Sequence, residues 1–355
     1  MKDFDLLKRL TETPGIPGRE ERVRQLIRDE AQGLFDGFEV DAMGNLICHR
    51  GGAGRLPKPA GSRRAAKAGK RIMLACHIDE IGFYVKHIDD KGFLRVNPAG
   101  GFDTRNLHAR AVLVQGTRDL VGVLNPTGRP VHLASEEERK KVYKIGEFFI
   151  DLGLPVEQVK RLVRVGDPVT LLAQTRQVGK SIVGKAMDNR VASFVALEAM
   201  RKVARKGTAN EILYVATVQE EVGCRGAGPA AFGIEPDVAV ALDVTLACDT
   251  PGVPEDEAVC RFGKGVAIKI MDRDSISDRA LVDEFIELAT KHKIPHQLEI
   301  LPLGGTDAAT MQRSRRGHKT ITLSVPCRYV HTVTEMVHQD DLTSAIDLLA
   351  AYLAK

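Results

Sequence analysis

Short, uninterrupted apolar runs separated by helix-like segments are the feature that most constrains how this chain can fold. The runs lie at residues 72–76, 212–216 and 238–242, and a further strand is expected at residues 321–325, where Thr322 and Ser324 separate the apolar residues. Continuous apolar runs of this length are typical of strands buried in a parallel sheet. Helical apolar patterns alternate with them, at residues 188–199, 278–292 and 340–353. This alternation predicts an α/β domain.

A β-rich segment interrupts the α/β pattern. Between residues 83 and 178, short alternating runs such as 111–114 and 120–123 are broken by glycines, which predicts a small β-rich unit. The sequence Ser135-Glu136-Glu137-Glu138 is a capping box and predicts a helix start within it. We therefore expect residues 1–82 and 179–355 to form one α/β domain, with residues 83–178 inserted into it.

The N-terminal part carries further local signals. Residues 3–32 predict a helix, a turn and a second helix, because two helical apolar patterns flank a segment rich in proline and glycine. Residues 38–49 predict a β-hairpin that turns at Gly44-Asn45.

Composition and charge exclude several classes of protein. The chain is 43% apolar and 28% charged, with a net charge of +4, which is ordinary for a globular protein. The basic stretch 51–71 has neither aromatic residues nor helical periodicity, so we interpret it as a surface loop and expect no nucleic-acid partner. The six scattered cysteines indicate a reducing compartment. No signal peptide or membrane-spanning run is present, so we expect a cytoplasmic protein without a membrane partner.

Acidic and imidazole side chains follow or flank the apolar runs. The positions are His77, Asp188, Glu220 and Glu221, Asp243, and His331. The carboxyl ends of parallel strands meet at one edge of a sheet, so these groups can converge although they are far apart in sequence. Imidazole and carboxylate both bind borderline divalent metals, so this combination suits two Zn²⁺ or Co²⁺ ions.

Each position also has a simpler interpretation when taken alone. A lone histidine after a strand is more often a satisfied core residue than a ligand. Asp188 precedes a helical pattern and is a good candidate for its N-cap. Asp243 can be an ordinary turn aspartate. The metal hypothesis depends on the whole set.

Ordered motifs make the chain similar to the M42 metallo-aminopeptidases, the tetrahedral aminopeptidase group. The resemblance spans nearly the whole length and runs through Thr13-Pro14-Gly15-Ile16-Pro17-Gly18, Asp41-Ala42-Met43-Gly44-Asn45, His77-Ile78-Asp79-Glu80, Gly166-Asp167-Pro168-Val169, Ala186-Met187-Asp188-Asn189-Arg190, Gln219-Glu220-Glu221-Val222-Gly223, Gly304-Gly305-Thr306-Asp307 and Arg328-Tyr329-Val330-His331. It implies an α/β/α catalytic domain of the zinc-peptidase type, with an inserted PDZ-like β-barrel that mediates dimerisation.

The resemblance also implies roles for individual residues. Asp188 would bridge two metal ions, with His77 and Asp243 completing one site and Glu221 and His331 the other. Glu220 would be the general base, and Asp79 would orient the His77 imidazole. Asn189 stands where the family is expected to carry Asp, which affects local hydrogen bonding more than metal binding.

The implied activity is release of N-terminal residues from short peptides, by a self-associating enzyme that forms a dodecamer. A metal-dependent deacylase or other amidohydrolase shares the same chemistry and stays open as an alternative. A glycoside hydrolase would explain the Glu220 and Glu221 pair but not the remaining ligands, and it requires no metal. The side-chain preference and the identity of the metal leave no readable pattern in the sequence.

Overall fold

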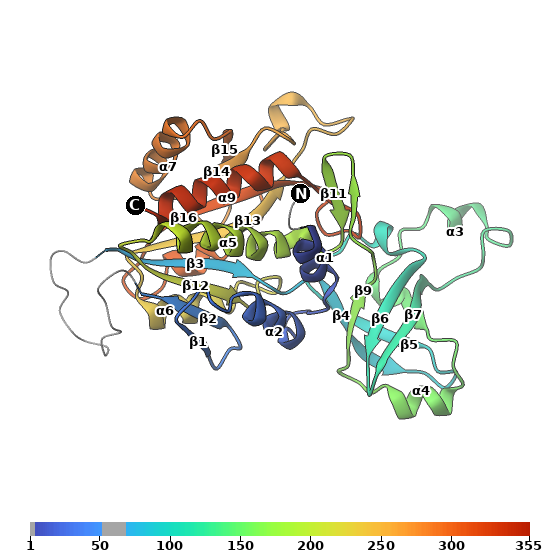
Figure 1. Ribbon diagram of the computed structural model, residues 1–355. Helices are drawn as coiled ribbons and strands as arrows, with labels where there is room; N and C mark the ends of the chain where they lie inside the picture. Colours follow the sequence, from blue (N-terminus) through green and yellow to red (C-terminus); the bar gives the residue numbers. More distant parts are fainter. Residues whose placement is uncertain (1–3, 52–68) are drawn as a thin grey trace.

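The computed structural model describes residues 4–51 and 69–355, and it consists of a large lobe built on one sheet and a smaller barrel beside it (Figure 1). Residues 52–68, the greater part of the predicted basic loop, lie outside the described residues. None of the described helices is long and apolar enough to cross a lipid bilayer. All six cysteines lie in the described ranges and are free thiols.

Most elements lie where the sequence places them. The helices are α1 (Phe4–Glu12), α2 (Glu21–Glu30), α3 (Glu136–Lys140), α4 (Val156–Leu162), α5 (Met187–Lys206), α6 (Ala227–Ile234), α7 (Arg279–Lys291), α8 (Ala308–Gln312) and α9 (Gln339–Leu353). The strands of the large lobe are β1 (Gly37–Val40), β2 (Leu46–Arg50), β3 (Arg71–His77), β10 (Arg176–Val178), β11 (Ser181–Gly184), β12 (Glu211–Thr217), β13 (Val238–Leu246), β14 (Val266–Met271), β15 (His296–Ile300), β16 (Lys319–Arg328) and β17 (Glu335–His338). The strands of the barrel are β4 (Gly82–Ile88), β5 (Leu94–Ala99), β6 (Arg110–Gln115), β7 (Asp119–Pro126), β8 (Phe148–Asp151) and β9 (Pro168–Leu171).

The four predicted strands form the centre of the main sheet. Its strands follow the order β1-β2-β12-β3-β13-β16-β17-β11-β10, and β14 and β15 pair beside β16. Strand β3 is parallel to β12 and β13, and β13 is parallel to β16. The carboxyl ends of these four strands therefore lie at the same edge of the sheet, as the sequence predicts.

Both faces of the central strands are buried, which explains the uninterrupted apolar runs of β3, β12 and β13. Along β3, Leu74 and Cys76 point into one core cluster, which includes residues of α1, α2, α5, α7 and α9. Met73 and Ala75 point into the opposite cluster, with residues of α6 and α8. The result is a three-layer α/β/α lobe, with α5 and α9 lying across one face of the sheet (Figure 1).

The predicted hairpin is present as antiparallel β1 and β2. The carboxylate of Asp41 accepts hydrogen bonds from three backbone amides of the turn, and the amide of Gly44 also donates to the Asp41 carbonyl at 3.0 Å. Asn45 is buried and reaches out of the hairpin, with Nδ2 donating to the carbonyl of Gly226 at 3.0 Å. The hairpin thereby holds a loop that follows β12.

The β-rich segment folds into a closed barrel with the strand order β4-β5-β8-β7-β6-β9. It has a hydrophobic cluster of its own, which includes Phe83, Val112 and Ile150. At the start of β4, a Cβ added to Gly82 would lie 2.2 Å from a side-chain carbon of Ile16. Glycine is required there because the barrel begins in close contact with the N-terminal turn. The predicted capping box at Ser135 is present at the start of α3.

Asp341 in the first turn of α9 gives the fold a pH-dependent contact. Its buried carboxylate accepts hydrogen bonds from the amides of Gly263 at 2.8 Å and Gly265 at 2.6 Å. Burial raises its pKa to about 6, opposed by these amides and by nearby His338. The folded state therefore binds this proton more tightly than the unfolded chain, whose Asp has a pKa of about 3.9.

We expect the free energy of unfolding of the wild type, relative to Asp341→Asn, to fall by roughly 2–3 kcal/mol as the pH rises from about 4 to 6. Urea unfolding of both proteins across this pH range measures the difference. A difference that stays constant over the range would contradict the assignment.

Candidate metal centre

The candidate ligands collect at the carboxyl edge of the central strands. His77 is the last residue of β3, Glu220 and Glu221 lie in the loop after β12, and His331 follows the end of β16. Asp243 differs from the expected position, because β13 continues to Leu246 and Asp243 lies within the strand. It is therefore not a turn aspartate.

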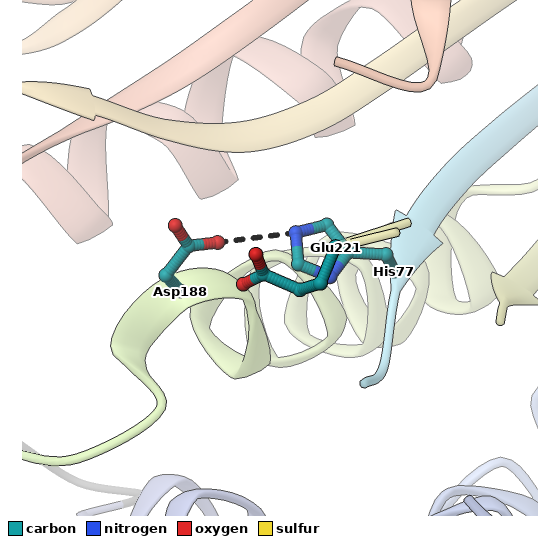
Figure 2. A group of neighbouring side chains, drawn as sticks. All are labelled: His77, Asp188 and Glu221. Carbon is teal, nitrogen blue, oxygen red and sulfur yellow. Dashed lines mark ion pairs between the residues drawn. The ribbon is translucent and has the colours of Figure 1, made fainter. Parts of the chain in front are cut away.

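Asp188 lies at the centre of this group and does not cap α5. The N-cap position is Ala186, and no side chain makes a capping hydrogen bond there. The Asp188 carboxylate is directed to two imidazoles instead, with Oδ1 3.1 Å from His77 Nε2 and Oδ2 3.5 Å from His331 Nε2. Figure 2 shows Asp188 at the start of α5 facing His77 at the end of β3. A carboxylate with one oxygen toward each of two imidazoles has the arrangement of a bridging ligand.

Two further carboxylates complete the group on either side of Asp188. Glu221 Oε2 lies 3.3 Å from Nε2 of His331, and Asp243 Oδ1 lies 3.8 Å from Nε2 of His77. One ligand atom each from His77, Asp188 and Glu221 lies within 4.8 Å of the others, and these three side chains are drawn in Figure 2. The structure thus brings all five sequence-predicted ligands to one place.

Glu220 lies beside the cluster and has two different neighbours. Its Oε2 is 3.9 Å from Nε2 of His77, and its Oε1 accepts a hydrogen bond from the Cys224 thiol at 3.1 Å. Burial raises the pKa of Glu220 well above its usual value, and the charges of Asp243 and Glu221 raise it further. A carboxylate with this environment binds a proton more readily than a solvated one.

The loop that carries Glu220 and Glu221 is held by its backbone amides. The amides of residues 218–221 donate in order to Asn45 Oδ1 (3.0 Å), Glu20 Oε1 (3.2 Å), Asp79 Oδ1 (3.1 Å) and Asp79 Oδ2 (3.0 Å). Three buried side chains from distant segments therefore fix four consecutive peptide groups. This arrangement orients two adjacent carboxylates differently, although they follow one strand.

Asp79 contacts His77 mainly through its backbone. The Asp79 carbonyl oxygen is 3.2 Å from Nδ1 of His77, whereas its carboxylate oxygen Oδ1 is 3.6 Å away. A backbone carbonyl accepts from Nδ1–H, which leaves Nε2 free to act as a ligand. The carboxylate of Asp79 is used chiefly to hold the amides of Glu220 and Glu221, a role that the sequence did not predict.

Replacing Asp79 with Asn is expected to lower metal affinity by about 10–100-fold, the usual effect of removing a partner that orients a ligand. An amide side chain cannot accept from both backbone amides, so the Glu220–Glu221 loop loses one contact. Metal titration monitored by calorimetry measures the change, with Asp90→Asn on the barrel surface as the matched control. Equal affinity in both variants would show that Asp79 does not position the ligands.

Sequence reasoning missed Glu335, which ties the two sides of the cluster together. Its Oε1 accepts from the amide of His331 at 2.7 Å and its Oε2 from the amide of Asp188 at 3.1 Å. Burial, together with the charge of Asp188, raises the pKa of Glu335 to about 8. No local pattern distinguishes this glutamate, because its partners lie on other elements.

The buried negative charge of the site favours the binding of cations. Four carboxylates (Asp188, Glu220, Glu221 and Asp243) surround only two imidazoles, and buried charge is costly unless it is paired. Burial alone would lower the pKa of His331, but its hydrogen bonds to Asp188 and Glu221 and their charges raise this pKa to about 12. Oε1 of Glu221 is buried and has no hydrogen-bond partner among the described residues. The nitrogen and oxygen donors fit divalent metals such as zinc or cobalt.

Comparisons with known proteins place this chain and its fold among the peptidases. The profile of the M42 glutamyl aminopeptidase family matches residues 60–348. A putative aminopeptidase of Acetivibrio thermocellus is 37% identical, over 98% of this chain and 97% of its own length. A lysyl aminopeptidase of Pyrococcus furiosus is 33% identical, over 99% of this chain and 97% of its own. The solved TET1 peptidase of Pyrococcus horikoshii is 31% identical with a TM-score of 0.85, and the match covers 99% of both chains.

The match to the family model and to these aminopeptidases, over nearly the whole chain, makes the protein a hydrolase of the aminopeptidase class. Within that class, the chain belongs to peptidase family M42. This family is metal-dependent, in agreement with the donor set described above.

Proposed function

We propose that this chain is a dinuclear-metal aminopeptidase that removes N-terminal residues from short peptides. The observation that carries the proposal is the Asp188 carboxylate, which lies between His77 and His331 with one oxygen toward each. Asp188 would bridge two divalent ions, zinc or cobalt, with His77 and Asp243 on one side and Glu221 and His331 on the other. When bound, the two ions supply Lewis acidity that activates a water and stabilises charge on the peptide carbonyl oxygen.

Glu220 is the residue that moves the proton. It is not one of the proposed ligands, and its Oε2 faces the cluster 3.9 Å from His77 Nε2. In this role Oε2 accepts a proton from the attacking water and then delivers it to the nitrogen of the leaving amine. The backbone hydrogen bonds from the amides of Glu220 and Glu221 to Asp79 keep the base and the neighbouring ligand in a fixed relation.

The free α-amino group of the substrate distinguishes an aminopeptidase from an endopeptidase. A neutral α-amine nitrogen is a further donor that zinc or cobalt ions accept beside imidazole and carboxylate. The ion held by Glu221 and His331 would be one such acceptor, since Glu221 Oε2 lies 3.3 Å from His331 Nε2. This ligand capacity supports recognition of the substrate N-terminus at the same site.

A panel of aminoacyl-anilides tests the proposal, with metal content measured on the same samples. We expect metal-reconstituted protein to release aniline from substrates with a free α-amine, and we expect a chelator to abolish the release. N-acetylated versions of the same substrates are the matched controls and should not react. Cleavage of the acetyl group instead would identify a deacylase, and chelator-insensitive cleavage of glycosides would identify a glycosidase.

We further propose that the inserted segment, predicted at residues 83–178, acts through its barrel (β4 to β9) as a self-association domain, and that the enzyme assembles into a dodecamer; Arg176–Val178 of the predicted segment belong to the main sheet as β10. The TET1 peptidase relative assembles into a tetrahedron or an octahedral shell. The barrel segment of this chain exposes apolar side chains that suit an interface, among them Val121 (66% exposed), Leu133 (68%) and Val142 (64%). Light scattering should give twelve times the mass of the single chain, and a monomer at micromolar concentration would contradict the proposal.

A further inference from the structure

A second group of metal-ligating side chains lies next to the proposed metal centre but shares none of its five ligands. Single ligand atoms of Glu220, Cys224 and Asp307 lie within 4.8 Å of one another. Neither Cys224 nor Asp307 has a role in the proposed hydrolysis. The group combines a thiol with two carboxylates, whereas the main cluster has only nitrogen and oxygen donors.

The backbone fixes the thiol at this position. Cys224 has a left-handed conformation with φ of 50°, its amide donates to the carbonyl of Glu220 at 2.8 Å, and its own carbonyl accepts from Thr310 Oγ1 at 3.2 Å. The loop after β12 is therefore tied to α8. As a result, Cys224 Sγ lies 3.1 Å from Glu220 Oε1, and the residue is only half-buried.

Asp307 provides independent evidence that this ligand group has room for a cation, because one of its carboxylate oxygens has no hydrogen-bond partner among the described residues. The residue is 2% exposed, and its Oδ2 accepts a hydrogen bond from Thr217 at 2.5 Å. Its Oδ1 is buried with no hydrogen-bond partner among the described residues. A buried carboxylate with an unpaired oxygen is costly, and a cation bound beside it would remove that cost.

We propose that Glu220, Cys224 and Asp307 form a third, inhibitory metal site for a thiophilic divalent cation such as Cd²⁺ or excess Zn²⁺. A thiolate ligand favours soft cations, so such an ion has a reason to prefer this site over the adjacent one. On binding, the cation takes the place of the thiol proton, which is released to the buffer, and no electrons are transferred. Inhibition follows because Glu220 is shared, and this step rests on the proposed role of Glu220 as the base.

Cadmium titration of the full-length enzyme loaded with two equivalents of Co²⁺ tests the site. The ultraviolet cadmium–thiolate absorption reports sulfur ligation, and the visible cobalt spectrum reports whether the two cobalt ions stay in place. We expect one equivalent of Cd²⁺ to produce the thiolate band, with peptidase activity falling in parallel while the cobalt spectrum persists. Loss of the cobalt spectrum without a thiolate band would overturn the proposal, because cadmium would then act at the main cluster.

Cys224→Ser is the decisive variant and Cys248→Ser its matched control. Cys248 is also a half-buried thiol, but it belongs to no such ligand group among the described residues. We expect Cys224→Ser to lose the band and to require at least about tenfold more Cd²⁺ for half-inhibition, and Cys248→Ser to behave as the wild type. A band that survives in Cys224→Ser, or disappears in Cys248→Ser, would overturn the assignment.

Asp307→Asn tests the contribution of the third ligand. This substitution keeps an acceptor for Thr217 but removes the negative charge, so cadmium affinity should again fall by at least about tenfold. The band does not depend on catalysis, which separates this proposal from the proposed function. A cadmium–thiolate band without inhibition would contradict the inhibitory role. If Glu220 proved not to be the general base, the band would still form.

Discussion

Replacing Glu220 with Gln is expected to lower the rate of peptide hydrolysis by about 10²–10⁴-fold while both metal ions stay bound. Gln keeps the shape of the side chain and an acceptor for Cys224, but it cannot take a proton from the attacking water. The five proposed ligands are untouched, so metal content should equal that of the wild type. Steady-state kinetics on an aminoacyl-anilide and elemental analysis of the same sample measure the two quantities.

The matched control is Glu157→Gln on the exposed surface of α4. It makes the same chemical change far from the cluster and should leave kcat/KM unchanged. Near-normal turnover by Glu220→Gln would exclude Glu220 as the general base. Loss of metal together with activity would instead make Glu220 a ligand.

Replacing Arg190 with Ala is expected to lower the free energy of unfolding by about 3–5 kcal/mol, the usual cost of breaking a buried charged network. Its side chain is fully buried, and Nη1 donates to the carbonyls of Leu10 (2.5 Å) and Thr13 (2.7 Å). Nη2 also lies 3.6 Å from Oε1 of buried Glu80. Alanine would leave these acceptors unpaired and the Glu80 carboxylate with one cation fewer. Equilibrium urea unfolding followed by circular dichroism measures the effect.

Arg22→Ala provides the comparison for this prediction. Arg22 forms a two-pronged ion pair with Asp119 at 2.7 and 2.8 Å, but both side chains are more than 40% exposed. Exposed ion pairs contribute about 0–1 kcal/mol, so this loss should be small. If both variants were destabilised equally, burial would not be the reason for the importance of Arg190.

Much of the architecture could be predicted from the sequence, because the local composition of each segment agrees with its burial in the fold. The run 72–76 is apolar without interruption because both sides of β3 face hydrophobic clusters. The barrel was visible only as a change to short alternating runs, since one face of strands such as β7 is exposed. The convergence of His77 and His331 follows from strand direction, which the α/β alternation already implies.

The structure differs from the single-residue interpretations of Asp188 and Asp243, because the local sequence around each is compatible with two structural roles. Asp188 precedes a helix, so the N-cap interpretation is reasonable in sequence, but its backbone departs from helical geometry and its carboxylate faces two imidazoles. Asp243 follows three apolar residues in the sequence, yet β13 continues past it. Strand ends depend on pairing with neighbours such as β16, which the sequence does not show.

Other contacts gave no local signal because both partners had to be known. Glu335 was not predicted, although it holds the backbones of Asp188 and His331. Asn45 looked like a turn residue, and its contact with the loop after β12 spans 173 residues of sequence. Asp307 lies in the glycine-rich motif Gly304-Gly305-Thr306-Asp307, which contributes to the family resemblance but did not suggest a role for this residue.

The central claim is that Asp188 bridges two metal ions at the carboxyl edge of the sheet. Anomalous scattering from crystals of zinc- or cobalt-loaded protein, collected at the metal absorption edge, tests it most directly. We predict two peaks on either side of the Asp188 carboxylate, one contacted by His77 and Asp243 and the other by Glu221 and His331. A single peak, or peaks away from Asp188 in protein that is fully active, would contradict the account.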